Sequence, residues 1–221
     1  EDAHRHLVRE VDGMRSTEHR RTAEDIEDDP KPALATDTPA FKSWFGSSKV
    51  VDADERPMVM YHGTSASEDG QAFSMFDTYA SNYGLMGMGG YFTADPEVAS
   101  SYTSKGKGAT PTVYPVYLSI KNPLDMDAKA DPQAWRKQFP DAEIHHEGGE
   151  TNESWYRAAE EALSDEGLPK WEGADVMQSG LRAMGFDGIT HIGGGRVQSD
   201  GVRHRVYIAF DPEQIKSATG N

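Results

Sequence analysis

The sequence predicts a mixed α+β domain, and three observations support this prediction. Apolar runs typical of strands lie early in the chain, at 57–62, and late, at 186–192 and 202–210. Between them, residues 131–184 carry the apolar periodicity of helices. This order lacks the regular strand–helix alternation of a doubly wound parallel sheet. A length of 221 residues also fits one sizeable core better than two.

The N-terminal segment differs in composition from the rest of the chain. Residues 1–36 mix charges of both signs, contain few large apolar residues and end in a proline-containing linker. Such a composition is typical of an exposed helical or disordered extension. We therefore expect a folded domain at residues 37–221 that follows this extension. Because the chain starts at Glu1 rather than at methionine, we also expect it to be processed or excised from a longer polypeptide.

The elements of the predicted domain can be placed in order. A short amphipathic helix starts at Thr38 and Pro39, which suit a cap and a first helical position, and Gly46 ends it. A second helix starts at Asp95 and Pro96 for the same reasons. The other expected elements are a strand within 112–126 and helices at 134–139, 155–163 and 176–184.

Composition excludes several kinds of site. The formal charge of −15, from 37 acidic and 22 basic residues, disfavours binding to a phosphate backbone. The absence of cysteine excludes disulfides, thiolate metal sites and a cysteine nucleophile. No apolar run reaches the roughly 18 residues of a membrane-spanning helix. His145 and His146 do not complete a metal-ligand set, so we expect no metal site. The composition as a whole leads us to expect a cytoplasmic protein with no membrane partner.

Three segments become informative when they are taken together. They are "YHGT" at 61–64, "GGYFTADPEVASSYT" at 89–103 and "VYIAFDPEQIKSATGN" at 206–221. Their order resembles that of ADP-ribosyltransferases of the diphtheria-toxin and poly(ADP-ribose) polymerase type, whose signature is a histidine, a tyrosine and a glutamate on separate strands. With "TPAFKSWFGSSKVV", "YPVYLSIKNPL" and "GFDGI", the chain is most similar, over residues 38–221, to ADP-ribosyltransferase domains of phage and mobile-element polyvalent proteins.

The resemblance implies split mixed β-sheets around a cleft for NAD, the substrate. His62 would donate to a ribose hydroxyl, the backbone of Gly63 would pair with the nicotinamide carboxamide, and Thr64 would add a hydroxyl contact. Tyr91 and Tyr102 would enclose the nicotinamide ring, because aromatic faces attract a cationic pyridinium. Holding NAD in this way favours cleavage of the nicotinamide–ribose bond through a cationic transition state.

The expected glutamate is the point at which this sequence departs from the family, because Val206 stands in its place. Three explanations are open. An acid can come from the preceding loop, where Asp200 is the nearest candidate, or His204 can take the polar role from the same strand face. Alternatively, the domain binds NAD and transfers nothing. Asp187 in "GFDGI" is better explained as a turn residue.

The resemblance implies a mono-ADP-ribosyltransferase that modifies a macromolecule, most plausibly a bacterial host protein in phage or inter-microbial conflict. The acceptor is expected to be a protein rather than a nucleic acid. Arg196, Arg203 and Arg205 give the last interstrand segment a local positive charge that would face either the acceptor or the NAD pyrophosphate. Two alternatives are a non-catalytic NAD or nucleotide-binding module of a polyvalent protein and an NAD glycohydrolase.

Overall fold

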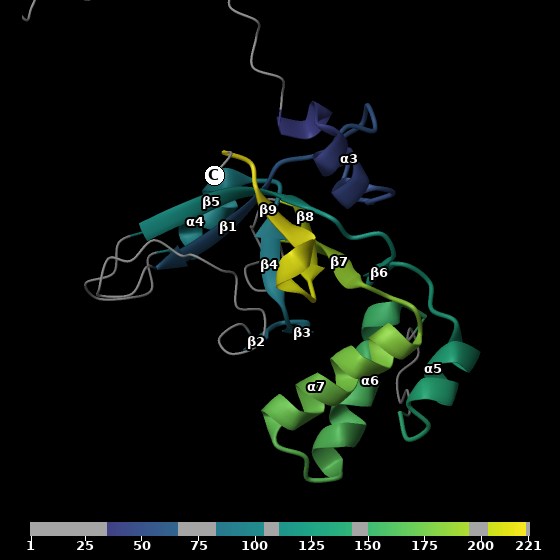
Figure 1. Cartoon of the computed structure of the whole chain (residues 1–221). Helices are drawn as coiled ribbons and strands as arrows, with labels where there is room; N and C mark the ends of the chain where they lie inside the picture. Colours follow the sequence, from purple (N-terminus) through teal and green to yellow (C-terminus); the bar gives the residue numbers. More distant parts are fainter. Residues whose placement is uncertain (1–34, 66–82, 104–110, 143–149, 195–202, 220–221) are drawn as a thin grey trace, which may run out of the picture. The chain divides into compact units, whose positions relative to one another are not determined.

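The computed structural model describes residues 35–65, 83–103, 111–142, 150–194 and 203–219 (Figure 1). Most of its strands form one mixed sheet with the order β6-β7-β8-β4-β1-β5-β9, in which β6 and β7 are parallel and the other neighbours antiparallel. These strands are β1 (Met60–Ser65), β4 (Gly90–Thr93), β5 (Pro111–Leu118), β6 (Pro123–Asp125), β7 (Gly188–Gly193), β8 (His204–Ala209) and β9 (Ile215–Ser217). The predicted α+β class is confirmed. Most of the predicted extension, residues 1–34, lies outside the described residues.

The two halves of the sheet meet at a short junction between β1 and β4. Among the described residues, β1 and β4 are in register at Tyr61 and Thr93, whereas β1 pairs with β5 along its whole length. Two split sheets were expected, and the structure instead joins β6-β7-β8-β4 to β1-β5-β9 through this one contact. Beyond this pair the two strands are not in register, and we call that stretch, at 62–65 and 90–92, the opening between β1 and β4.

Each face of the sheet carries its own apolar core. On β8, alternate side chains point to opposite faces, so Val206 and Ile208 face one core and Tyr207 and Ala209 the other. We call the face that carries Val206 and Ile208 the helical face, because its core includes apolar side chains of α5 (Pro132–Gln138), α6 (Asn152–Asp165) and α7 (Lys170–Ala183). Figure 1 shows these helices grouped beside β6 and β7.

The two N-terminal helix starts were predicted correctly. In α3 (Pro39–Phe45), the Thr38 hydroxyl accepts a hydrogen bond from Phe41 N at 3.1 Å. In α4 (Pro96–Ser101), the Asp95 carboxylate accepts from the amides of the first turn. Capping of this kind satisfies amides that have no partner inside the helix. In the described part of the chain, no helix is both long and apolar enough to cross a bilayer.

The strand predicted within 112–126 is broken into β5 and β6. The Asp187 carboxylate explains the break, because it accepts hydrogen bonds from Lys121 N at 2.8 Å and Asn122 N at 2.7 Å. Both backbone amides thus bond to a side chain just before β7 rather than to another strand, and the strand is interrupted there. Asp187 is thus a turn-fixing residue, which confirms its structural interpretation.

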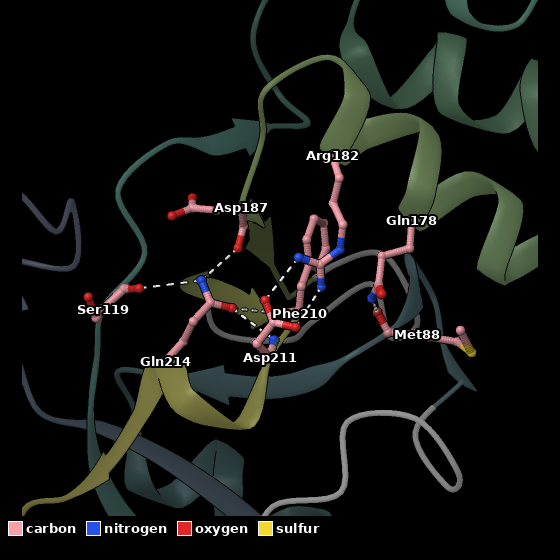
Figure 2. A network of polar contacts seen from close by, with 8 residues as sticks. All are labelled: Met88, Ser119, Gln178, Arg182, Asp187, Phe210, Asp211 and Gln214. Atoms are coloured by element: carbon pink, nitrogen blue, oxygen red, sulfur yellow. Dashed lines mark hydrogen bonds and ion pairs between the residues drawn. The ribbon is translucent and has the colours of Figure 1, made fainter. Parts of the chain in front are cut away.

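Gln214 joins the segment after β8 to the rest of the sheet (Figure 2). Its side-chain oxygen accepts from Phe210 N and Asp211 N, both at 2.9 Å. Its amide nitrogen donates to the carbonyls of Asp187 at 2.7 Å and Ser119 at 3.3 Å. One side chain thus connects "GFDGI", "FDPEQI" and the break after β5, which explains these segments as architecture.

A second contact in the same region fixes α7 against the end of β8. Arg182 makes two parallel bonds to the Asp211 carboxylate, at 2.9 and 2.8 Å, and its guanidinium lies 5.2 Å from the ring centre of Phe210. Bidentate pairs of this kind restrict orientation as well as distance. Further along α7, Gln178 donates to Met88 O at 3.3 Å in β3 (Gly87–Met88) (Figure 2).

Candidate functional site

His62 lies where β1 and β4 separate. Its Nδ1 is 2.8 Å from the carbonyl oxygen of Tyr91, so the imidazole bonds to the neighbouring strand just past the last registered pair. Burial lowers the pKa of His62 below its ordinary value, and the bond to Tyr91 opposes this in part. The ring is therefore neutral at pH 7, with Nδ1–H donating to the carbonyl. Nε2 consequently carries no proton, so it would accept a hydrogen bond from a ribose hydroxyl, and the expectation that His62 donates to that hydroxyl is wrong.

Gly63 lies under helix α4. A methyl group added to Gly63 would lie 1.7 Å from the carbonyl oxygen of Ala99, so only glycine fits. Ala99 is buried, and α4 packs against β1 at this point. The backbone of Gly63 is thus held beside the helix that Tyr102 follows.

The ring of Tyr91 is held at its hydroxyl end by a small hairpin, β2 (Tyr83–Gly84) and β3. The hydroxyl donates to Gly87 O at 2.8 Å and accepts from Met86 N at 3.0 Å. A methyl group added to Gly84 would lie 2.3 Å from Cζ of Tyr91. Tyr91 is therefore a fixed surface rather than a mobile side chain. This hairpin was not predicted, although the spacing of glycines in "YGLMGMGG" was its signal in the sequence.

Tyr102 follows α4 as its C-terminal cap residue and is 56% exposed. It lies three residues after Ala99, and residues at that spacing share a helix side. Tyr102 is thus close in sequence to the point where α4 contacts Gly63. Thr64 is half-buried in β1, opposite Thr112 of β5. The structure therefore brings His62, Gly63, Tyr91 and the end of α4 together.

The second part of the predicted site lies on β8. Val206 is buried on the helical face, opposite Thr93 of β4 and His191 of β7. His204 lies over Gly193, where an added methyl group would be 2.5 Å from Nε2 of His204 and 2.9 Å from Cγ2 of Val206. Asp200, the preferred acid, falls outside the described residues.

The arginines expected to give the segment between β7 and β8 a positive charge differ in their surroundings. Arg205 pairs with Asp125 of β6 at 3.6 Å, so its charge is balanced within the sheet. Arg203 is exposed, and Arg196 lies outside the described residues. Between 35 and 219, where placement is described, no group of three His, Asp or Glu side chains is arranged to hold a metal ion.

Thr93 and His191 are two polar residues beside the predicted site that sequence reasoning did not single out. Both are buried, and both flank Val206 across the sheet. His191 lies within the apolar strand "GITHI", where a lone histidine gives no sign of its neighbours. The signal is the pairing of β7 with β8, which can be read only from the structure.

This arrangement has the groups needed to hold a planar cation attached to a ribose. A neutral imidazole does not repel positive charge, a bare glycine backbone offers hydrogen bonds, and tyrosine rings stack on aromatic cations. Fixed groups of this kind contribute to catalysis because they need no reorganisation when charge develops.

Comparisons with known proteins agree with this chemistry. The family model described as "ADP-Ribosyltransferase in polyvalent proteins" matches residues 52–221. No curated protein matches the chain. The crystal structure of an anti-CRISPR protein aligns over 72% of this chain and 95% of its own, with 13% sequence identity and a TM-score of 0.36. This last likeness is too weak to bear on function.

Proposed function

Because the chain belongs to the family of ADP-ribosyltransferases in polyvalent proteins, we propose that it is a mono-ADP-ribosyltransferase acting on a macromolecule. Domains of this family use NAD as substrate. In the proposed reaction the bond between C1′ of the ribose and the nicotinamide nitrogen breaks, and its electron pair leaves with nicotinamide. A nucleophilic atom of the acceptor bonds to C1′ and loses a proton.

The observation that carries this proposal is the opening between β1 and β4. There the His62 imidazole bonds to the Tyr91 carbonyl at 2.8 Å, and Gly63 lies against Ala99. In our proposal the Gly63 backbone binds the carboxamide, Tyr91 and Tyr102 contact the nicotinamide ring, and His62 presents Nε2 to a ribose hydroxyl.

The proposed acceptor is a protein. A net charge of −15 repels the phosphate backbone of a nucleic acid, whereas it leaves many protein surfaces accessible. By family likeness, the acceptor would belong to a bacterial host, and the reaction would take place in that host's cytoplasm during phage or inter-microbial conflict. Incubating the protein with labelled NAD and host lysate tests this, because label should enter protein and resist nuclease.

A second candidate, an NAD-binding module without activity, is favoured by one observation. Val206 is buried and apolar at the position expected for the glutamate, so it cannot stabilise a cation. Nicotinamide release from NAD separates the two functions. We expect release by the wild-type chain and its loss in Asp200→Ala or His204→Ala, whereas binding without release would support the module. Release without transfer of label to any acceptor would indicate a glycohydrolase.

A further inference from the structure

A row of side chains crosses the helical face beside the candidate site. Tyr61 pairs with Thr93, Thr93 with Val206, and Val206 with His191. Cross-strand partners point to the same face, with their β-carbons about 4.5–5.5 Å apart. The row therefore runs from β1, next to His62, to the imidazole of His191 on β7.

The row adjoins the residues that would hold nicotinamide. Gly63 and Tyr91 lie two residues from Tyr61 and Thr93 on the same strands, so they share the helical face and form the next row. Two residues advance a strand by about 7 Å. From Tyr91, His191 lies one row along and two strands across the sheet, whereas His204, opposite Gly193, lies two rows along, about 14 Å, and one strand across.

The polar groups within this row are few. Val206 has no polar side-chain atom, and the Thr93 hydroxyl accepts from Asp95 N at 3.1 Å at the start of α4. Thr93, Val206 and His191 are all buried, at 6%, 8% and 5% exposure. Hydrogen bonds are stronger in such dry surroundings than in water. The imidazole of His191 is the group next to Val206 that can replace the hydrogen-bonding capacity of a carboxylate.

We propose that His191 binds NAD, with its imidazole accepting a hydrogen bond from a hydroxyl of the nicotinamide ribose and holding that ribose over Val206. This deepens the proposed function and rests on it. His191 enters the site from β7, and it acts as an oriented acceptor rather than as a negative charge. It is a different residue from His204, which lies one row further along the sheet from Tyr91.

The test is a double-mutant cycle with the full 221-residue chain. Dissociation constants are measured by calorimetry for wild type and His191→Ala, with NAD and with analogues that lack the 2′- or the 3′-hydroxyl of the nicotinamide ribose. We expect His191→Ala to weaken NAD binding by about tenfold or more, the effect of one good hydrogen bond. For the analogue that lacks the hydroxyl bound by His191, the same substitution should cause little further loss of affinity, because that hydrogen bond is already missing.

Two controls separate binding from folding. Ile189→Val removes one methylene from the same strand and face and should leave NAD affinity unchanged, while His191→Gln should recover part of the affinity lost in His191→Ala. Equal losses with NAD and with both analogues would overturn the proposal for His191, as would unchanged binding in a folded His191→Ala. If either result were found and wild type still released nicotinamide, the proposed function would stand and only the role of His191 would fall. A wild-type chain that neither binds nor cleaves NAD would overturn both.

Discussion

The two sides of the candidate site are built in different ways. On the β1–β4 side, His62 and Tyr91 each lie next to a glycine in the sequence. Hydrogen bonds link Tyr91 to His62 and to the β2–β3 hairpin. On the β7–β8 side, Val206 replaces the expected acid, and the polar groups are histidines set by strand pairing. In our proposal the first side binds nicotinamide, whereas the second lacks the charge that was expected there.

This contrast separates substrate binding from charge stabilisation. Backbone hydrogen bonds and aromatic stacking depend on the shape of the site. We therefore expect them to form as long as Gly63, Tyr91 and α4 keep their positions. Stabilising a cation needs a negative group placed within the site. Substitutions that remove a ring or a backbone contact on the β1–β4 side should therefore weaken NAD binding, and substitutions on the β7–β8 side should alter the hold on the ribose or the rate after binding.

The largest effect is expected for Gly63→Ala. The new methyl group would lie 1.7 Å from the Ala99 carbonyl oxygen, so α4 must move away from β1. We expect loss of measurable nicotinamide release and a decrease of about 1–3 kcal/mol in the free energy of unfolding. Gly173→Ala in α7 is the matched control, because its nearest neighbour is 4.0 Å away. A fully active Gly63→Ala would contradict the packing described here.

The next largest effect is expected for Tyr102→Ala, which should separate binding from stability. Because Tyr102 is 56% exposed, its loss should change the free energy of unfolding by less than about 0.5 kcal/mol, yet weaken NAD binding by about tenfold. Tyr91→Phe should have the opposite pattern. It keeps the aromatic ring, so NAD affinity should change little, but it loses the hydrogen bonds to Met86 and Gly87, so the free energy of unfolding should fall by about 1–2 kcal/mol. Calorimetry and urea unfolding give both quantities. Unaltered affinity in Tyr102→Ala would remove it from the site.

A smaller effect on function is expected away from the site, in Gln214→Ala. Four hydrogen bonds of the Gln214 side chain disappear, so the free energy of unfolding should fall by roughly 2–4 kcal/mol. The NAD affinity of the molecules that remain folded should be unchanged. If affinity fell as much as in Tyr102→Ala, the region in Figure 2 would be part of the site rather than its support.

The smallest effect concerns pH. Because the pKa of His62 is lowered by folding, the folded state binds fewer protons at this position than the unfolded state below the ordinary pKa of 6.5. The stability contribution of neutral His62 is therefore present above pH 6.5 and lost as the pH falls through the folded pKa. Urea unfolding of wild type and His62→Gln between pH 5 and 8 checks this. Parallel pH profiles would show that His62 does not titrate differently on folding.

Local sequence patterns predicted the α+β class and the starts of α3 and α4. They succeeded because Thr38, Asp95 and the prolines after them act on neighbouring backbone amides. The residues proposed for the β1–β4 side came from the family resemblance, whose motifs each lie in one strand or beside one helix, and their role stays a prediction. The structure also confirms the turn role of Asp187.

Sequence patterns did not predict contacts that depend on strand pairing. His191 meets Val206 through pairing of β7 with β8, and the register of that pair does not show in either segment alone. The break between β5 and β6 depends on Asp187, 65 residues from Asn122. Arg205 was expected to face a partner, but it pairs with Asp125 because β6 lies next to β7.

In the proposed function, the opening between β1 and β4 holds NAD for cleavage. Nicotinamide release by the purified chain, measured for wild type, Tyr102→Ala and Gly173→Ala in parallel, tests it most directly. We expect release by wild type and Gly173→Ala and at least about tenfold less by a stably folded Tyr102→Ala at limiting NAD. Equal release by all three proteins, or no NAD binding by wild type, would contradict it.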